Sequence, residues 1–294
     1  MEVTTFKSGF VSIIGKPNVG KSTLMNRLVG EQLSIITPKA QTTRHRIMGI
    51  LNGENYQVVY SDTPGILEPK YSLHEAMMSY VKVSLEDADL ILLVVELGEK
   101  YDALFDRFKK FSTPILLVIN KIDQAKGSQV KDKVAYWKEC LPMVREIIPV
   151  SANTGKNTDH LMRTIIDLMP IHPPYFPTDE MTDRSERFFA SEIVREKIFL
   201  NYSDEIPYSS EVSITSFKEE EDIIRIRAEI YVERDSQKGI LIGKGGSSLK
   251  KVGIEARADM ESFFQKKVFL ETHVKVADNW RKQTNKLRQF GYLE

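Results

Sequence analysis

The chain has 294 residues, with 41 Lys and Arg against 41 Asp and Glu, and 41% apolar and 28% charged residues, which is typical of a folded globular protein. This composition excludes a fibrous or disordered chain, and the length predicts two domains of about 150 residues each. The apolar stretches are far shorter than the roughly 20 residues that span a bilayer, so they predict buried strands. The first residues lack an export-signal pattern and Cys140 is the single cysteine, so we expect a cytoplasmic protein without disulfides.

Apolar runs alternate with longer amphipathic segments from Phe10 to Met169. The apolar runs are residues 10–14, 57–61, 90–95, 115–119 and 147–150, and the amphipathic segments are residues 22–28, 73–85, 101–111, 130–138 and 159–169. This alternation predicts an α/β domain in which a mostly parallel sheet has helices on both faces. Ligand loops are expected at the carboxyl ends of its strands.

Residues 169–178 hold four of the twelve prolines and indicate a break. We therefore expect a first domain at 1–172, a Pro-rich linker at 173–183 and a second domain at 184–294. In the second domain, periodicity predicts helices over 184–200 and 247–264, strands over 212–217, 224–232 and 268–276, and a basic terminal helix. This second domain is expected to be α+β.

Charge is unevenly divided within the second domain. Residues 191–235 carry 6 basic and 12 acidic side chains, whereas residues 236–294 carry 12 basic and 6 acidic ones. Such asymmetry is typical of nucleic-acid binding but also of a solvated helix face, so a motif must decide between them.

The segment Gly15–Ser22 matches the phosphate-binding pattern G-x-x-x-x-G-K-[ST] and lies between a predicted strand and a predicted helix. Main-chain N–H groups can converge on phosphate oxygens there, and the helix N-terminus adds positive charge. We expect Lys21 to reach the β- and γ-phosphates and Ser22 to bind Mg²⁺. The predicted phosphate-binding residues are Gly15, Lys16, Pro17, Asn18, Val19, Gly20, Lys21, Ser22, Thr23 and Gly65.

Two later segments are predicted to complete this site. Asp62-Thr63-Pro64-Gly65 follows a strand, which places Asp62 near the metal and the Gly65 N–H towards the γ-phosphate. Asn120-Lys121-Ile122-Asp123 follows another strand and predicts guanine selectivity, because the Asp123 carboxylate can accept both the ring N–H and the exocyclic amine. The Lys121 stem can cover the purine face, Asn120 can bond its edge, and Ser151-Ala152 can present a main-chain N–H to the guanine carbonyl.

With these motifs in this order, the sequence resembles the translation-factor-related GTPases. The resemblance implies GTP and GDP as ligands, hydrolysis of GTP, and a first switch at Gln41-Thr42-Thr43-Arg44. Thr43 would join Ser22 and Asp62 as an Mg²⁺ ligand, with Thr42 as the alternative. The predicted switch residues are Thr42, Thr43, Asp62, Thr63, Pro64 and Gly65.

One position departs from Ras-like proteins, which carry a water-orienting Gln directly after the D-x-x-G glycine. Here that residue is Ile66, which cannot hydrogen-bond water, so we expect slow intrinsic hydrolysis. Asn18 resembles the residue that, in related GTPases, helps hold a K⁺ ion in place of an arginine finger. It is therefore the candidate K⁺ site.

Gly243-Lys244-Gly245-Gly246 stands between two predicted helices, in the order strand, strand, helix, G-x-x-G, helix, strand. This arrangement resembles a type II (bacterial) KH domain. In such a domain the glycine loop approaches the sugar-phosphate chain, and an apolar groove, here expected from Ile240, Ile242, Ile254 and the strand 224–232, takes about four unstacked bases. The predicted RNA-binding residues are Ile242, Gly243, Lys244, Gly245, Gly246, Lys250, Lys251 and Arg257.

The two domains together resemble the Era family of bacterial GTPases over essentially the whole chain. The resemblance implies a monomer that binds small-subunit ribosomal RNA near its 3′ end and assists maturation of the immature small subunit. It also implies a cytoplasmic location with peripheral contact at the inner face of the cell membrane. Two alternatives stay open: an RNA-binding assembly factor with guanine nucleotide as a structural ligand, and a membrane-associated regulatory GTPase.

Overall fold

The computed structural model describes residues 5–293, so Met1–Thr4, on which the expectation about export partly rests, and Glu294 lie outside the described residues. The chain forms two compact units. Of the described residues, the first unit comprises 5–34, 43–68 and 77–183, and the second comprises 35–42, 69–76 and 184–293. Within residues 5–293, no helix combines the length and the apolar character needed to cross a membrane.

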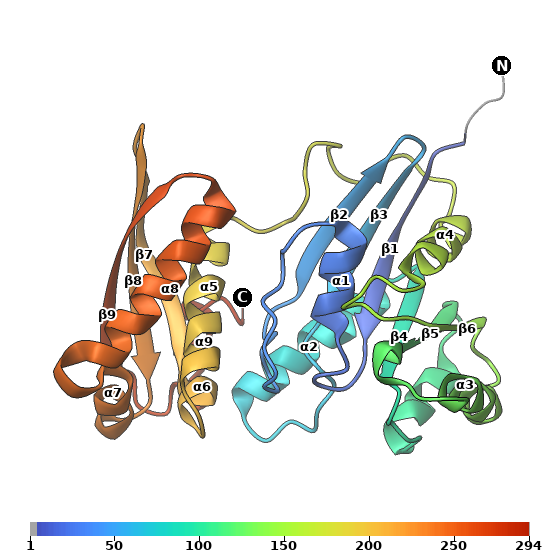
Figure 1. Ribbon diagram of the computed structural model, residues 1–294, viewed down its shortest axis with the longest axis horizontal. Coiled ribbons are helices and arrows are strands. Elements are labelled where there is room, and N and C mark those ends of the chain that lie inside the picture. The colour runs from blue at the N-terminus through green and yellow to red at the C-terminus, as the bar shows by residue number, and fades with distance from the viewer. Residues whose placement is uncertain (1–4, 294) are drawn as a thin grey trace. The chain divides into compact units, whose positions relative to one another are not determined.

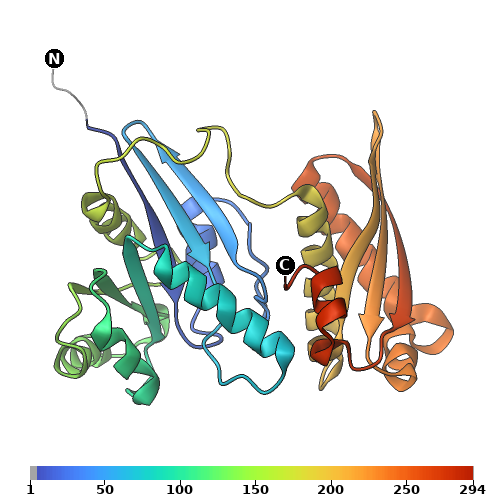
Figure 2. The ribbon, with the colours of Figure 1, turned by 180° about the vertical axis from the view of Figure 1, so that it is seen from behind.

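The first unit contains a six-stranded sheet in the order β2-β3-β1-β4-β5-β6, in which β2 is antiparallel to β3 and the other neighbours are parallel. The strands are β1 (Lys7–Ile14), β2 (Ile47–Gly53), β3 (Tyr56–Asp62), β4 (Leu90–Glu96), β5 (Ile115–Asn120) and β6 (Glu146–Pro149). The helices are α1 (Lys21–Val29), α2 (Ser72–Glu86, of which residues 77–86 belong to this unit), α3 (Gln129–Cys140) and α4 (Thr158–Leu168), with short 3₁₀ segments η1 (Ala103–Lys110) and η2 (Ile122–Gln124). Figure 1 shows α1 and α4 before one face of the sheet, and Figure 2 shows α2 before the other.

The core of the first unit explains why its strands are continuous apolar runs. Every side chain of β4 from Leu90 to Val95 is fully buried. On the face towards η1 and α3, Leu93 and Val95 pack in one cluster with Phe105, Phe108 and Trp137. Because both faces of the sheet are covered, no polar alternation is needed. The predicted α/β fold class is confirmed.

Two elements differ from the sequence prediction. The edge strand β2 was not predicted, since Ile47–Gly53 lacks both a continuous apolar run and a clean alternation. It forms because it pairs along its whole length with β3. The amphipathic segment 101–111 forms a 3₁₀ helix over Ala103–Lys110, with the Asp102 side chain accepting from the Leu104 N–H at its start.

The Pro-rich segment 173–183 is packed along the first unit. The buried Gln57 side chain accepts the main-chain N–H groups of Tyr175 and Phe176 at 2.7 and 3.0 Å, and its amide donates to the Phe176 carbonyl at 2.8 Å. Further along, Thr182 forms a bridge with Gly49 of β2. The segment is therefore held against β3 and the edge strand β2 by hydrogen bonds.

The second unit packs α5 and α8 on a three-stranded sheet of order β7-β8-β9, with β7 antiparallel and β9 parallel to β8. Its elements are α5 (Glu186–Asn201), α6 (Ile206–Ser209), β7 (Glu211–Glu219), β8 (Ile223–Val232), α7 (Asp235–Ile242), η3 (Lys244–Gly246), α8 (Ser247–Phe264), β9 (Lys267–Val276), η4 (Trp280–Lys282) and α9 (Thr284–Gln289). This is the predicted KH order. The basic terminal helix is only six residues long, and Trp280 nearby is fully buried, with its indole N–H donating to the Ser209 carbonyl at 2.8 Å.

Candidate functional site

The phosphate loop joins the end of β1 to the start of α1, and its glycines leave no room for side chains. A Cβ on Gly15 would lie 2.3 Å from the Val94 carbonyl oxygen, and one on Gly65 would lie 2.6 Å from the main-chain nitrogen of Pro17. Gly20 has φ +95°, a left-handed conformation that favours glycine. Gly65 therefore lies against the phosphate loop.

Lys21 is buried at the base of this loop. Its ammonium donates to the carbonyl oxygens of Gly15 and Lys16 at 3.2 and 2.9 Å. Burial lowers the pKa of Lys21 to about 8, against the opposing effect of the Asp62 and Glu99 carboxylates. A phosphate group would add further negative charge beside this buried ammonium.

Three oxygen-bearing side chains meet beside Lys21. The Ser22 hydroxyl lies 2.6 Å from Asp62 Oδ2 and 2.8 Å from the Thr43 hydroxyl. Asp62 is fully buried, and its Oδ1 atom has no hydrogen-bond partner among the described residues. Burial raises the pKa of Asp62, while the Ser22 hydrogen bond and the Lys21 charge oppose that shift. Such a group of hard oxygen donors with one unused carboxylate oxygen fits Mg²⁺.

The two candidate threonines of the first switch have different surroundings. The Thr43 hydroxyl faces Ser22, whereas the Thr42 hydroxyl bonds Thr37 at 2.6 Å and the Lys39 carbonyl at 2.8 Å. Thr63 is fully buried and donates to the Ile13 carbonyl at 2.9 Å. The geometry therefore favours Thr43 over Thr42 as the metal-facing threonine.

The base-recognition residues come together at the carboxyl ends of β5 and β6. The buried Asn120 amide donates to the Val19 carbonyl at 2.9 Å, and its oxygen accepts the Ala152 N–H at 3.0 Å. The Asp123 carboxylate accepts the Ser151 hydroxyl at 2.6 Å. Asn120 thus ties the phosphate loop to the loop after β6.

Three contacts of this site were not predicted from the sequence. The Lys121 ammonium pairs with Glu96 at 2.7 Å, and Glu96 is the last residue of β4. Lys16 pairs with Glu99 at 3.1 Å and with Asp102, and these bonds raise its pKa although burial opposes the shift. The Lys16 side chain is thus committed to two carboxylates. Of these partners, only Glu96 could have been expected from the sequence, because it is a polar residue at the carboxyl end of a strand.

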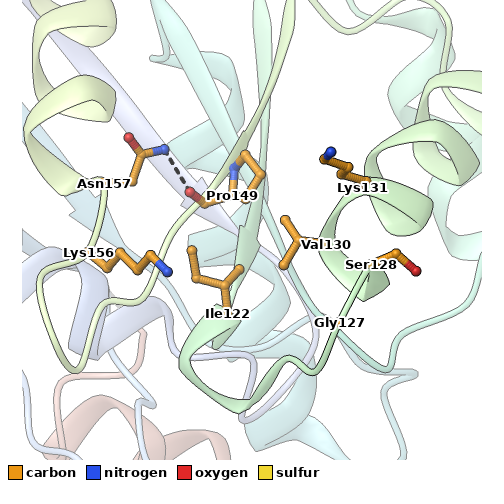
Figure 3. A pocket seen from close by; sticks show the side chains of 8 residues that line it. All are labelled: Ile122, Gly127, Ser128, Val130, Lys131, Pro149, Lys156 and Asn157. Carbon is orange, nitrogen blue, oxygen red and sulfur yellow. Dashed lines mark hydrogen bonds between the residues drawn. The ribbon is translucent and has the colours of Figure 1, made fainter.

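Behind the base-recognition loops lies an open hollow of about 770 Å³, drawn in Figure 3. Ile122, Val130 and Pro149 form its apolar part, and Lys131 and Lys156 stand at its rim. Asn157 closes one side by donating to the Pro149 carbonyl at 2.8 Å. None of the predicted base-binding residues lines this hollow, although Ile122 stands between Lys121 and Asp123.

In the second unit, the glycine loop joins α7 to α8. Gly243 has φ +73°, and a Cβ there would lie 2.2 Å from the Ser248 hydroxyl, so only glycine fits. Gly245 and Gly246 also have positive φ, but a Cβ on either would meet nothing within 4 Å. Two main-chain positions of the loop are therefore open to an approaching ligand, beside the exposed Lys244.

The predicted apolar groove is present only in part. Ile240 and Ile254 are 58% and 53% exposed. The apolar side chains of β8, such as Ile226 and Ile230, are fully buried in the core and cannot line a groove, so that part of the expectation was wrong. The reason is that α5 and α8 cover the face of the sheet to which they point. Lys250, Lys251 and Arg257 are exposed along α8, and Ile242 is half-buried.

Comparisons with known proteins agree with this geometry. Residues 10–121 match the family of 50S ribosome-binding GTPases, and residues 205–281 match the KH domain family. GTPase Era of Geobacter metallireducens is 45% identical over 298 residues, covering 99% of this chain and 100% of that protein. Two solved structures are each 40% identical to this chain, and each match covers 98% of this chain and 100% of the other. The first is Era in complex with MgGDPNP and nucleotides 1506–1542 of 16S ribosomal RNA, with a TM-score of 0.93. The second is an Aquifex aeolicus Era variant bound to GDP and AlF₄⁻, with a TM-score of 0.94.

A near-full-length match at this identity, with both domains in the same order, shows the family. The guanine-nucleotide ligand and GTP hydrolysis follow with it. The chain belongs to the Era family of GTPases.

Proposed function

We propose that this GTPase binds single-stranded RNA near the 3′ end of small-subunit ribosomal RNA and assists maturation of the immature small subunit. The observation that carries the proposal is the presence of a nucleotide site and an open glycine loop in one chain. The Ser22, Asp62 and Thr43 group adjoins the phosphate loop, and the glycine loop at Gly243–Gly246 is open at two main-chain positions. The Era complex that aligns with 98% of this chain holds both MgGDPNP and a 16S RNA segment.

The matched GTPase family is described as binding the 50S subunit, whereas the RNA in the Era complex comes from the small subunit. The 50S description covers residues 10–121 alone, and the Era complex aligns with both units. Because the KH loop lies outside the range of the GTPase family model, the small subunit is the better-supported target.

For the metal, we propose that Ser22, Thr43 and Asp62 hold the Mg²⁺ that accompanies GTP. The unused Asp62 oxygen and the two converging hydroxyls support this assignment. Because Thr43 lies in the first switch, loss of the γ-phosphate would release this loop. GTP and GDP would then present two different forms of the switch.

Hydrolysis needs a group other than Ile66. That side chain is 5% exposed and packs in the core of the first unit, while its N–H donates to the Gly15 carbonyl at 3.0 Å. We propose that K⁺ beside the exposed Asn18 supplies the missing positive charge. We further propose that the protein is a cytoplasmic monomer with peripheral contact at the inner face of the cell membrane.

The RNA assignment is tested by filter binding of the full chain to a short single strand from the 3′ region of 16S RNA, with GDPNP and with GDP. Lys244→Asp should weaken RNA binding at least ~10-fold, or about 1.4 kcal/mol, because it repels phosphate at the glycine loop. Gly245→Asp should act likewise, since its position is sterically open and Asp tolerates positive φ.

The matched control is Lys218→Asp, which makes the same charge change at an exposed lysine of β7 in the same unit. Undiminished RNA binding by the two loop variants would overturn the assignment. If RNA binding is the same with GDPNP and with GDP and no GTP turns over, the chain is instead an assembly factor that holds its nucleotide as a structural ligand.

A further inference from the structure

The loop after β6, residues Ser151–Gly155, carries the main-chain N–H that is proposed to meet the guanine carbonyl. Bonds within the loop fix its two ends. The Ser151 N–H donates to the Lys156 carbonyl at 3.0 Å, and the Gly155 N–H donates to the Ser151 carbonyl at 2.9 Å. The carbonyls of Ala152 and Asn153, in the middle of the loop, receive no main-chain donor among the described residues. These two carbonyls are therefore available to a side-chain donor from elsewhere in the chain.

That side chain is Arg27, from the last turn of α1. Its Nε donates to the Ala152 carbonyl at 3.1 Å, and its Nη2 donates to the Asn153 carbonyl at 2.8 Å. These two residues lie 125 and 126 positions away in the sequence. A planar guanidinium with several fixed donors can bridge two successive carbonyls, which a single ammonium does less well.

These two bonds restrain the position of Ala152 from its carboxyl side. They fix the peptide planes on the carboxyl side of Ala152 and of Asn153, so the backbone at Ala152 has little freedom to turn. On the other side of Ala152, its N–H meets Asn120 Oδ1 at 3.0 Å. Arg27 and Asn120 thus hold the same residue from opposite sides.

Both restraints also connect the Ser151–Gly155 loop to the phosphate loop. Asn120 donates to the Val19 carbonyl at 2.9 Å, and α1, which carries Arg27, begins at Lys21. The helix is anchored by its buried Leu24, Met25 and Leu28. A nucleotide needs a fixed distance between its phosphates and the group that reads its base, and α1 provides a rigid link between the two.

We propose that Arg27 is a positioning residue for guanine selectivity: it holds the Ser151–Gly155 loop so that the Ala152 N–H, which donates to Asn120 Oδ1, can be shared with or transferred to the oxygen at C6 of the base when the nucleotide binds. This inference rests on the proposed role of Ala152 in the nucleotide site. Arg27 does not touch the nucleotide in this account and acts only through the loop. Because it is itself exposed, its effect is on affinity and dissociation and not on folding.

The test compares dissociation constants of three diphosphates for the full chain: GDP, IDP and 2-aminopurine riboside diphosphate. IDP lacks only the amine that Asp123 is proposed to accept, and the 2-aminopurine nucleotide lacks the C6 oxygen and the ring N–H. Arg27→Ala should weaken GDP and IDP about fivefold each, which is about 1 kcal/mol, and leave the 2-aminopurine nucleotide nearly unchanged. GDP should also dissociate about fivefold faster.

Two further variants separate positioning from a general loss of structure. Arg27→Lys should recover part of the GDP affinity, because an ammonium can still reach one carbonyl. Arg27 and the exposed Arg163 of α4 line a second hollow, and Arg163→Ala should change none of the three affinities.

The affinities of the variant test the role of Arg27, and those of the parent test the proposed base contacts. If Arg27→Ala weakens all three nucleotides equally, the positioning role is wrong while the nucleotide site stands. If the parent binds the 2-aminopurine nucleotide as tightly as GDP, the proposed base-reading role of Ala152 and Asp123 fails first, and the role of Arg27 with it.

Discussion

The Ser22 hydroxyl lies 2.6 Å from the Asp62 carboxylate, and it joins the start of α1 to the end of β3. The two residues are 40 positions apart in the sequence, and the Thr43 hydroxyl reaches the same point at 2.8 Å. The other oxygen of Asp62 is buried without a partner among the described residues. A divalent cation would satisfy that oxygen and replace the hydrogen bonds of the two hydroxyls.

Ser22→Ala should therefore remove most of the Mg²⁺ dependence of GDPNP binding. In Mg²⁺ the affinity should fall at least ~10-fold, about 1.4 kcal/mol, and in EDTA it should match the parent. Calorimetric titration in both buffers measures this. Ser12→Ala, which removes a buried hydroxyl bonded to Ser84, serves as the control. An unchanged Mg²⁺ dependence in Ser22→Ala would contradict the metal assignment.

Lys21 should make stability depend on pH in the metal-free, nucleotide-free protein. Its pKa is about 8 in the folded chain, against 10.5 for the unperturbed group. Between these values the unfolded chain binds more protons, so the free energy of unfolding should rise with pH from about 8 to about 10.5, by at most about 1.4 kcal/mol per pH unit. Urea unfolding at pH 8, 9 and 10 in EDTA should show this slope in the parent and not in Lys21→Met. Equal slopes would show that Lys21 keeps an ordinary pKa.

Asp123→Asn should exchange guanine for xanthine. In the parent, the Asp123 carboxylate accepts the Ser151 hydroxyl at 2.6 Å, and the amide oxygen of the variant can keep this bond. The amide NH₂ then faces the base, where guanine also presents donors, so the two groups cannot pair. GDP affinity should fall at least ~100-fold, about 2.7 kcal/mol, and XDP affinity should rise. Fluorescence titration of both nucleotides measures the exchange. Asp132→Asn also changes a carboxylate that accepts a serine hydroxyl, from Ser128, and should leave both affinities unaltered.

GTP hydrolysis should be slow and faster in K⁺ than in Na⁺ at equal ionic strength, because the buried Ile66 cannot orient water. Asn18→Ala should abolish the difference between the salts in single-turnover assays. Asn157→Ala is the matched control, since Asn157 is also an exposed asparagine in the left-handed region, with φ 62° against 65° for Asn18. Equal rates of the parent in both salts would exclude Asn18 and leave RNA or another partner as the activator.

Local sequence determined the elements whose patterns are self-contained. The helix predicted over 247–264 has those bounds in the structure, because its apolar periodicity and the glycines before it are local signals. The phosphate loop and the segments that begin at Asp62 and Asn120 were placed at strand ends for the same reason. A short motif fixes its own main-chain conformation, and the carboxyl ends of parallel strands bring such motifs to one edge.

Tertiary structure decided what depends on distant partners. The strand β2 forms because β3 is available to pair with it, and the side chains of β8 are buried because α5 and α8 cover them. The choice of Thr43 over Thr42 follows from which hydroxyl faces Ser22. Arg27 and Ala152 are 125 residues apart, and no local pattern predicts that contact. Sequence periodicity describes an element and its faces, whereas the partner of each face is set by packing among elements far apart in the chain.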